Sequence, residues 1–208
     1  MNILAIETSL PQASLSLYME GEFRYADKWT AERNHDAALF PALKQALATL
    51  GDAPLDLILV GAGPGSYGGI RVALAAAVGI ATVKHARMAS ICSWENLAPD
   101  GCSIVSDARR GGWTLRKPNG ELSVLTAEQL ISETKNGLNI ATVESAESLA
   151  KLGITPVAAG LVPTAQSITS AWHALSPAEQ ERLLQTPPEP IYVRPPHITE
   201  AKKKPWEV

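Results

Sequence analysis

A glycine-rich loop between an apolar strand and an apolar helix constrains the fold of this chain most. Residues 57–60 are Leu-Ile-Leu-Val, and this unbroken apolar run predicts a strand over 56–62 that is buried on both sheet faces. The loop itself, 63–69, contains four glycines and a proline, too many backbone breakers for regular structure. From Ile70 to Val83 the sequence is alanine-rich and free of proline, which predicts a helix. A strand, a glycine loop and a helix in this order can direct backbone N–H groups toward an anion.

Two nucleotide-binding motifs are excluded at this loop. Gly63, Gly65 and Gly68 match G-x-G-x-x-G, but the dinucleotide fingerprint also requires an acidic residue about 20 positions later. Residues 57–94 contain no Asp or Glu. No Lys-Ser/Thr pair follows the last glycine, so the loop is not a Walker A motif either. It is therefore either an anion-binding loop or a structural turn that starts the helix.

The predicted helix is apolar on two sides. One stripe contains Ala73, Ala77 and Ala81, and the other contains Val72, Ala76, Gly79 and Val83. A helix that is apolar nearly all round is enclosed by its own protein or covered by a partner. The 12 residues of 72–83 are too few to span a bilayer, which takes roughly 18 or more.

The remainder of the first half predicts a strand meander followed by a helix. Apolar or alternating segments at 3–6, 14–18 and 23–29 predict three consecutive strands joined by short turns. A helix is expected over 36–50, and Pro41 should kink it or delay its start. Together with the strand and helix described above, this order predicts an α/β fold.

A boundary is expected near residue 100, and the second half then reads as a reduced copy of the first. Thr126 should cap a helix, with Gln129 as its capping-box partner. The other predicted elements are strands at 103–107, 113–116, 121–125, 138–143 and 155–160, and helices at 144–152, 163–175 and 177–184.

Composition excludes several classes of protein. The 208 residues are 46% hydrophobic with a net charge of −3, which suits a globular core and provides no field that attracts nucleic acid. Cys92 and Cys102 lack metal-ligand or redox spacing, and we expect reduced thiols in a cytoplasmic protein with no signal peptide and no metal site. Neither H-E-x-x-H nor G-x-S-x-G occurs, so a peptidase is not expected.

The loop also resembles the G-P-G-S-[FY]-T-G-[VL]-R signature of the TsaB (YeaZ) family. Its residues here are Gly63, Pro64, Gly65, Ser66, Tyr67, Gly68, Gly69 and Arg71, with Gly68 in place of the family's threonine. Three further segments resemble family motifs in the right order: 33–41, 107–111 and 189–194.

This resemblance implies two ribonuclease-H-like lobes of the actin, Hsp70 and sugar-kinase superfamily, at 1–100 and 101–208. In that superfamily an Asp-x-[Gly/Ser/Thr] hairpin handles nucleotide phosphates or a metal, and the matching residues here are Glu7, Thr8 and Ser9. Asp107 and Arg109 are the corresponding candidates for contacts between the lobes. The longer Glu7 side chain argues against ATP chemistry.

The function that the resemblance implies is that of a non-catalytic subunit. Such a chain pairs with a homologous catalytic TsaD-type subunit and an ATPase of the TsaE type, which carry the ATP and metal, to place threonylcarbamoyl on N6 of adenosine 37 in tRNAs that read ANN codons. This chain needs no cofactor of its own, reaches tRNA through the complex and dimerises when alone. The expected partner interface comprises Leu39, Leu43, Leu47, Ile70, Ala73, Ala77 and Ala81. The alternative is a nucleotide-dependent phosphotransferase or ATPase of the same fold.

Other polar residues keep two interpretations each. His35 is a substrate contact or a helix cap, and the segment 107–110 is a polar site or a surface salt-bridge cluster. Lys202–Lys204 contact tRNA or form a solvated tail, and Trp206 stacks on a base or anchors the terminus.

Overall fold

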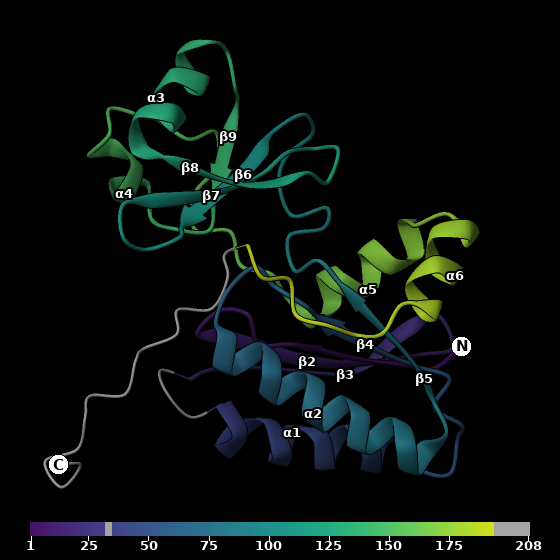
Figure 1. Cartoon of the computed structure of the whole chain (residues 1–208). Coiled ribbons are helices and arrows are strands. Elements are labelled where there is room, and N and C mark those ends of the chain that lie inside the picture. The colour runs from purple at the N-terminus through teal and green to yellow at the C-terminus, as the bar shows by residue number, and fades with distance from the viewer. Residues whose placement is uncertain (32–34, 194–208) are drawn as a thin grey trace, which may run out of the picture.

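The computed structural model describes residues 1–31 and 35–193, with the side chains of residues 35 and 36 left aside. Its backbone forms two β-sheets, one above the other in Figure 1, with helices packed on each. The predicted α/β class is therefore confirmed.

The first sheet has five strands in the order β3-β2-β1-β4-β5. They are β1 (Ile3–Glu7), β2 (Gln12–Met19), β3 (Glu22–Thr30), β4 (Leu57–Gly61) and β5 (Arg87–Ile91). The first three form the predicted antiparallel meander, and β4 and β5 run parallel to β1. Every residue of β1 and β4 is buried, because helices cover both faces of the sheet.

Helices α1 (His35–Leu50) and α2 (Tyr67–Lys84) cover one face of this sheet. Pro41 lies inside α1, so it does not delay the helix start. Helix α2 begins three residues before the predicted Ile70, because the Ser66 hydroxyl caps it by accepting from the Gly69 N–H. The 18-residue helix is long and apolar enough by composition to cross a bilayer, so the length argument against a membrane span was wrong. Its inner side, however, is part of the protein core.

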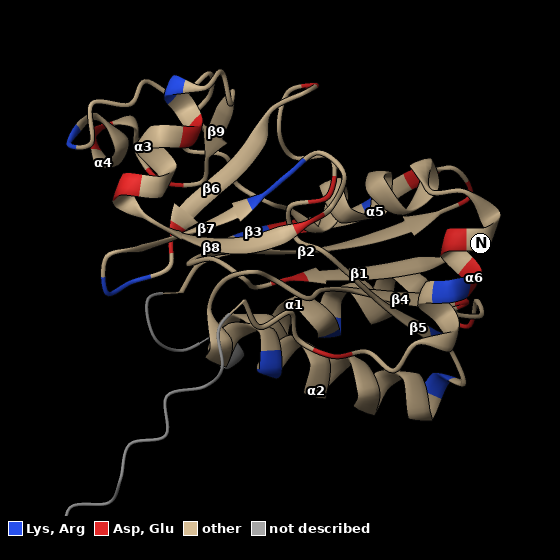
Figure 2. Cartoon of the chain, turned by 45° about the horizontal axis from the view of Figure 1, so that its top comes forward, with Lys and Arg blue, Asp and Glu red and all other residues tan. Residues whose placement is uncertain are grey.

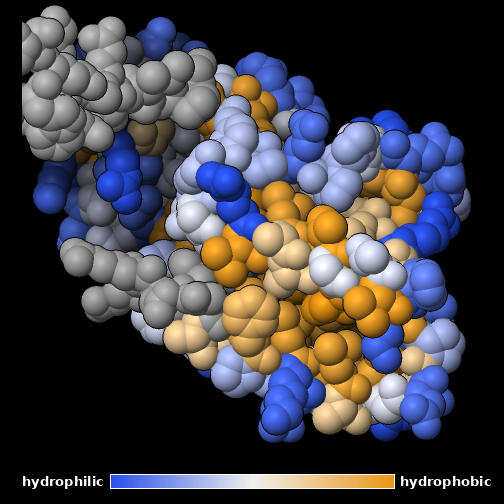
Figure 3. Space-filling view, turned by 60° about the horizontal axis from the view of Figure 1, so that its bottom comes forward, coloured by the Kyte–Doolittle hydropathy of each residue, from blue (hydrophilic) through white to orange (hydrophobic). Residues whose placement is uncertain are grey.

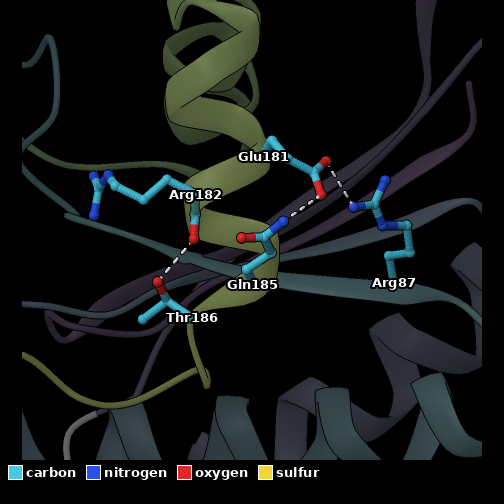
Figure 4. A network of polar contacts seen from close by, with 5 residues as sticks. All are labelled: Arg87, Glu181, Arg182, Gln185 and Thr186. Atoms are coloured by element: carbon cyan, nitrogen blue, oxygen red, sulfur yellow. Dashed lines mark hydrogen bonds and ion pairs between the residues drawn. The ribbon is translucent and has the colours of Figure 1, made fainter.

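Helices α5 (Ala165–Ala174) and α6 (Pro177–Gln185) cover the opposite face of the same sheet. Ile168 and Trp172 pack there in one core cluster with β1, β4 and β5. An ion pair of 3.0 Å between Glu181 on α6 and Arg87 on β5 joins the helix to the edge strand (Figure 4). The expected lobe boundary near residue 100 placed these helices in the second lobe. In the structure the chain crosses back after the second sheet, and both helices pack on the first sheet. Alternate side chains of β1 and β4 leave both sheet faces apolar, so each face requires its own helical layer.

The second sheet has four strands in the order β8-β7-β6-β9. They are β6 (Ser103–Asp107), β7 (Gly112–Arg116), β8 (Leu122–Thr126) and β9 (Ile140–Thr142), with helices α3 (Ala127–Lys135) and α4 (Ala146–Ala150). Its antiparallel β6-β7-β8 and parallel β9 repeat the pairing pattern of β1 to β4. The capping box of Thr126 and Gln129 is present as predicted. The strand expected at 155–160 is only a bridge between Ala141 and Ala158.

Candidate functional site

The residues of the predicted partner interface lie on the inner side of the helix pair, against the first sheet. Ala73 and Ala77 are fully buried, and Leu39, Leu43 and Ile70 lie with them in the core between the helices and the sheet. Leu47 and Ala81 are partly buried against the same core. Alanines at four-residue spacing bring α2 close to its own sheet, so this stripe is not available to another chain.

The opposite, outer side of α2 is exposed and also apolar. A hollow of about 480 Å³ is lined by Phe40 of α1 and by Val72, Ala75, Ala76, Gly79 and Ile80 of α2. Phe40 is 57% exposed and Val83, near the end of α2, is 76% exposed. We call these seven residues the outer patch, and Figure 3 shows apolar side chains gathered on this side of the molecule. Figure 2 shows that α2 carries its cationic residues, Arg71 and Lys84, only near its two ends.

The glycine loop is tied to the end of β1. The Ser66 N–H donates to the Ser9 carbonyl over 2.6 Å, and the Thr8 hydroxyl donates to the Gly69 carbonyl over 2.8 Å. A side chain at Gly65 would collide with Ser9, so glycine is required for this close approach. The Gly63 N–H donates to the Ser93 hydroxyl. These backbone donors of the loop are thus used within the chain.

Glu7 is enclosed beneath the loop. It is fully buried, and its carboxylate accepts from the Ser9 N–H over 2.7 Å. The position is possible because Gly61 on β4 has no side chain, since a Cβ there would overlap the Glu7 carboxylate. Burial raises the pKa of Glu7, and hydrogen bonds from Ser9 and Ser93 oppose the rise.

A cleft of about 750 Å³ opens between the two sheets. Of the predicted inter-lobe residues, Ser9, Asp107 and Arg109 line it, whereas Glu7 and Thr8 are not among the described residues at its wall. Asp107 accepts from the Arg109 N–H over 2.6 Å, and the Asp107 N–H donates to the Glu144 carboxylate over 3.3 Å. Arg109 and Arg110 both have positive φ, so the turn that carries them is sharply bent.

Among the lining residues that the sequence analysis did not name as site residues are Trp94, Glu144 and Tyr192. Tyr192 follows α6, and its segment is held by the Ile191 N–H, which donates to the Ala62 carbonyl over 2.8 Å. Its ring centroid lies 5.3 Å from that of Tyr67. Tyr192 lies in the segment 189–194 that resembles a family motif, but no local pattern brings the three residues together, because they come from separate parts of the chain that meet only in the fold.

Several other predicted features have no defined role in the structure. No group of three metal-ligating side chains occurs within 1–31 and 35–193. Both cysteines are free, and burial raises the pKa of the Cys92 thiol, so its reactive thiolate is disfavoured. His35 begins α1, but its side chain and residues 194–208, including Lys202–Lys204 and Trp206, lie outside the described part.

Known proteins resemble the chain in both sequence and fold. Residues 29–112 match the family model described as "TsaD: tRNA N6-adenosine threonylcarbamoyltransferase". The chain is 34% identical to the Bacillus subtilis protein named tRNA threonylcarbamoyladenosine biosynthesis protein TsaB, over 53% of this chain and 52% of the relative. The Escherichia coli protein of the same name is 29% identical, over 61% of this chain and 49% of the relative. The resemblance to the TsaB (YeaZ) family is confirmed.

The fold likeness extends further than the sequence matches. YeaZ from Pseudomonas aeruginosa superposes with a TM-score of 0.68 and 23% identity, over 92% of this chain and 99% of that one. A second Pseudomonas aeruginosa structure, described as similar to peptidase YeaZ, gives a TM-score of 0.70 over 93% and 99%. At this identity the likeness shows the fold alone. In sequence, the chain spans about half the length of the Bacillus and Escherichia relatives.

Proposed function

We propose that this chain is a non-catalytic subunit in the biosynthesis of threonylcarbamoyladenosine on tRNA, and that it docks on a homologous catalytic subunit through the outer patch. The observation that carries the docking surface is the exposure of Phe40 and Val83, together with the exposure of Ala75 and Gly79 between them on the same side. The relatives' names supply the biosynthetic process, and the TsaD-type family match over 29–112 suggests the partner class.

The patch has the form expected of a helix-pair interface. The small residues at 75, 76 and 79 would let a second helix pack closely on α2, with the distance between the two helix axes near the short end of the usual range of about 8–10 Å. Large exposed apolar residues at its margin would otherwise remain in water. The proposed interface uses the opposite side of the same two helices, because the predicted alanine stripe is buried against the sheet.

Glu7 supports a role without phosphate chemistry in this chain. Glu7 stands where the resemblance would put the superfamily's phosphate-binding aspartate, and here it is a fully buried carboxyl under the loop that does not line the cleft. In this proposal ATP and metal belong to the partner subunits, and the chain has two ribonuclease-H-like lobes and works in the cytoplasm. When alone, it pairs with a second copy through the same patch.

The test is association with a TsaD-type subunit from the same cell, measured by sedimentation and calorimetry. Gly79→Arg places a bulky charge in the patch, and nothing lies within 4 Å of the position that its Cβ would take. Because a buried unpaired charge is strongly unfavourable, association should weaken at least about a hundred-fold while circular dichroism stays unchanged.

Ala150→Arg is the matched control, since it introduces the same charge at an exposed helical position of the second lobe. It should bind the partner like wild type and restore threonylcarbamoyladenosine in cells depleted of the native protein. Wild-type binding by Gly79→Arg, or no binding by the unmodified chain, would overturn the proposal.

A further inference from the structure

We propose that residues 194–208 of this chain lie across the outer patch when no partner is bound. These residues are outside the described part of the structure. The inference therefore rests on where the described chain ends, on the shape and charge of the patch, and on the amino-acid sequence of the segment. It adds a competitor from the same chain for this surface, and only its consequence for partner binding rests on the proposed function.

The described chain ends at the head of the exposed side of α2. The ring centroid of Tyr192 lies 5.3 Å from that of Tyr67, the first residue of the helix. The exposed residues that follow Tyr67 at four-residue spacing form one stripe along the outer side of α2: Arg71, Ala75 and Gly79. The proposed segment begins two residues after Tyr192, so it begins where this stripe begins.

The length of the segment matches the length of α2. The helix has 18 residues and is therefore about 27 Å long. Pro195 and Pro196 favour an extended path, which advances about 3.1 Å per residue. On such a path Ile198 lies about 16 Å along the helix, which is the level of Gly79. Lys202–Lys204 then lie at the C-terminal end of the helix.

The middle of the patch has room for an apolar side chain. The hollow there has a volume of about 480 Å³, and nothing lies within 4 Å of the position that a Cβ at Gly79 would take. Ile198 is the only Leu, Ile, Phe or Met in the segment. Contact between its side chain and the hollow removes apolar surface of both from water, which favours the covered state.

Charge at the far end of the helices favours the three lysines. Helices α1 and α2 end at the same edge of the first sheet, because the strands that follow them, β4 and β5, are parallel and begin side by side. Helix α1 has no basic residue in its last turn, and the exposed Asp52 lies two residues after its end. The carbonyl groups at a helix C-terminus carry partial negative charge, so they and Asp52 attract Lys202–Lys204. Helix α2 already has Lys84 in its last turn, which directs the lysines toward α1.

The experiment measures how fast a thiol on the patch is alkylated in the full chain. Gly79→Cys places the thiol at the hollow, and Ala150→Cys places one at an exposed helical position of the second lobe as the control. Modification by iodoacetamide is followed by peptide mass spectrometry, which separates each position from Cys92 and Cys102. A tethered segment has an effective concentration on the order of 1 mM, so even a weak contact keeps the patch covered most of the time.

Ile198→Asp should raise the alkylation rate of the Gly79→Cys protein about five-fold or more, because a charged side chain is unfavourable in an apolar hollow. Ile198→Val should keep the rate low, and neither change should alter the rate of the Ala150→Cys control. The rates should not depend on protein concentration, since the covering segment belongs to the same chain. Equal rates with and without Ile198→Asp would overturn the proposal. Protection that appears only as the protein concentration rises would also overturn it and would assign the cover to a second copy.

A charge exchange tests the far end of the segment. Asp52→Lys should raise the alkylation rate of the Gly79→Cys protein about two-fold, and so should the joint replacement of Lys202–Lys204 by glutamate. Combining both sets of changes should return the rate toward that of the unexchanged protein, because the opposite charges then face each other again. A combined rate higher than either single effect would overturn the proposed path of the segment.

The consequence for the partner is measured separately. If the segment competes for the patch, Ile198→Asp should bind a TsaD-type subunit about five-fold more tightly than the unmodified chain, because less of the patch is covered. Unchanged affinity would overturn the competition. Absence of binding by every form would refute the proposed function while the alkylation rates still decide the cover, and equal alkylation rates would refute the cover alone.

Discussion

The two sides of α2 are nearly equal in apolar character and opposite in environment. On the inner side Ala73 and Ala77 are fully buried against the sheet, whereas on the outer side Ala75 and Gly79 are exposed. The inner residues are buried by the chain's own sheet, with no second protein. The outer residues require a partner to be buried.

This difference shows that small residues at helical spacing do not identify an intermolecular face by themselves. The regular alanine stripe lets α2 approach its own sheet, and the outer side combines small residues with the larger Phe40, Val72 and Val83. A comparison of substitutions on the two sides is therefore the sharpest test of which side is internal.

The largest effect is expected from Ala77→Arg on the inner side. A bulky charge without a partner in a packed core should lower the free energy of unfolding by about 3–5 kcal/mol. Ala75→Arg, two residues away on the exposed side, should change it by no more than about 0.5 kcal/mol. Urea denaturation measures both, and similar values for the two variants would contradict the assignment of sides.

Phe40→Gln tests the outer side through self-association. Phe40 is exposed at the edge of the patch, so its loss should leave unfolding nearly unchanged while it weakens dimerisation of the isolated chain about ten-fold. Sedimentation equilibrium gives the dimer constant. Phe23→Gln, at another exposed phenylalanine on β3, is the control and should dimerise normally.

Glu7→Gln tests the buried region beneath the start of α2 by pH. Because burial raises the folded-state pKa of Glu7, its contribution to stability is fully present below about pH 4.5 and is lost as pH rises toward the raised value. The neutral variant lacks this loss, so its stability relative to wild type should increase with pH above about 4.5. Denaturant unfolding of both proteins across roughly pH 4–8 measures the difference in their free energies of unfolding. If that difference stayed constant with pH, the pKa of Glu7 would not be raised by folding.

The smallest effect is expected from Gly79→Ala. The added methyl group meets open space on the outer side, so the variant should gain about 0.5–1 kcal/mol from helix propensity alone. The same substitution at Gly61 should destabilise the protein, because its methyl group would overlap the Glu7 carboxylate. Thermal unfolding distinguishes the two, and a loss at Gly79 would indicate that this side is packed.

Local signals were sufficient where the determining contacts are themselves local. The meander, the strand at 103–107 and the capping box at Thr126 depend on neighbouring residues, and all are present. The sequence analysis placed the start of α2 too late, because glycines in general favour a loop. Here Gly68 and Gly69 belong to the first turn of the helix, which the Ser66 cap and the hydrogen bond from Thr8 to the Gly69 carbonyl stabilise.

The sequence by itself determined the α/β class, the elements around the glycine loop and the likeness to TsaB (YeaZ), because periodicity and motif order are properties of the chain alone. Only the tertiary structure decided which side of α2 is buried, where α5 and α6 pack, and that Tyr192 reaches the cleft beside Tyr67. An apolar face can be buried by any other apolar surface, so its actual partner is set by long-range packing that the local pattern does not contain.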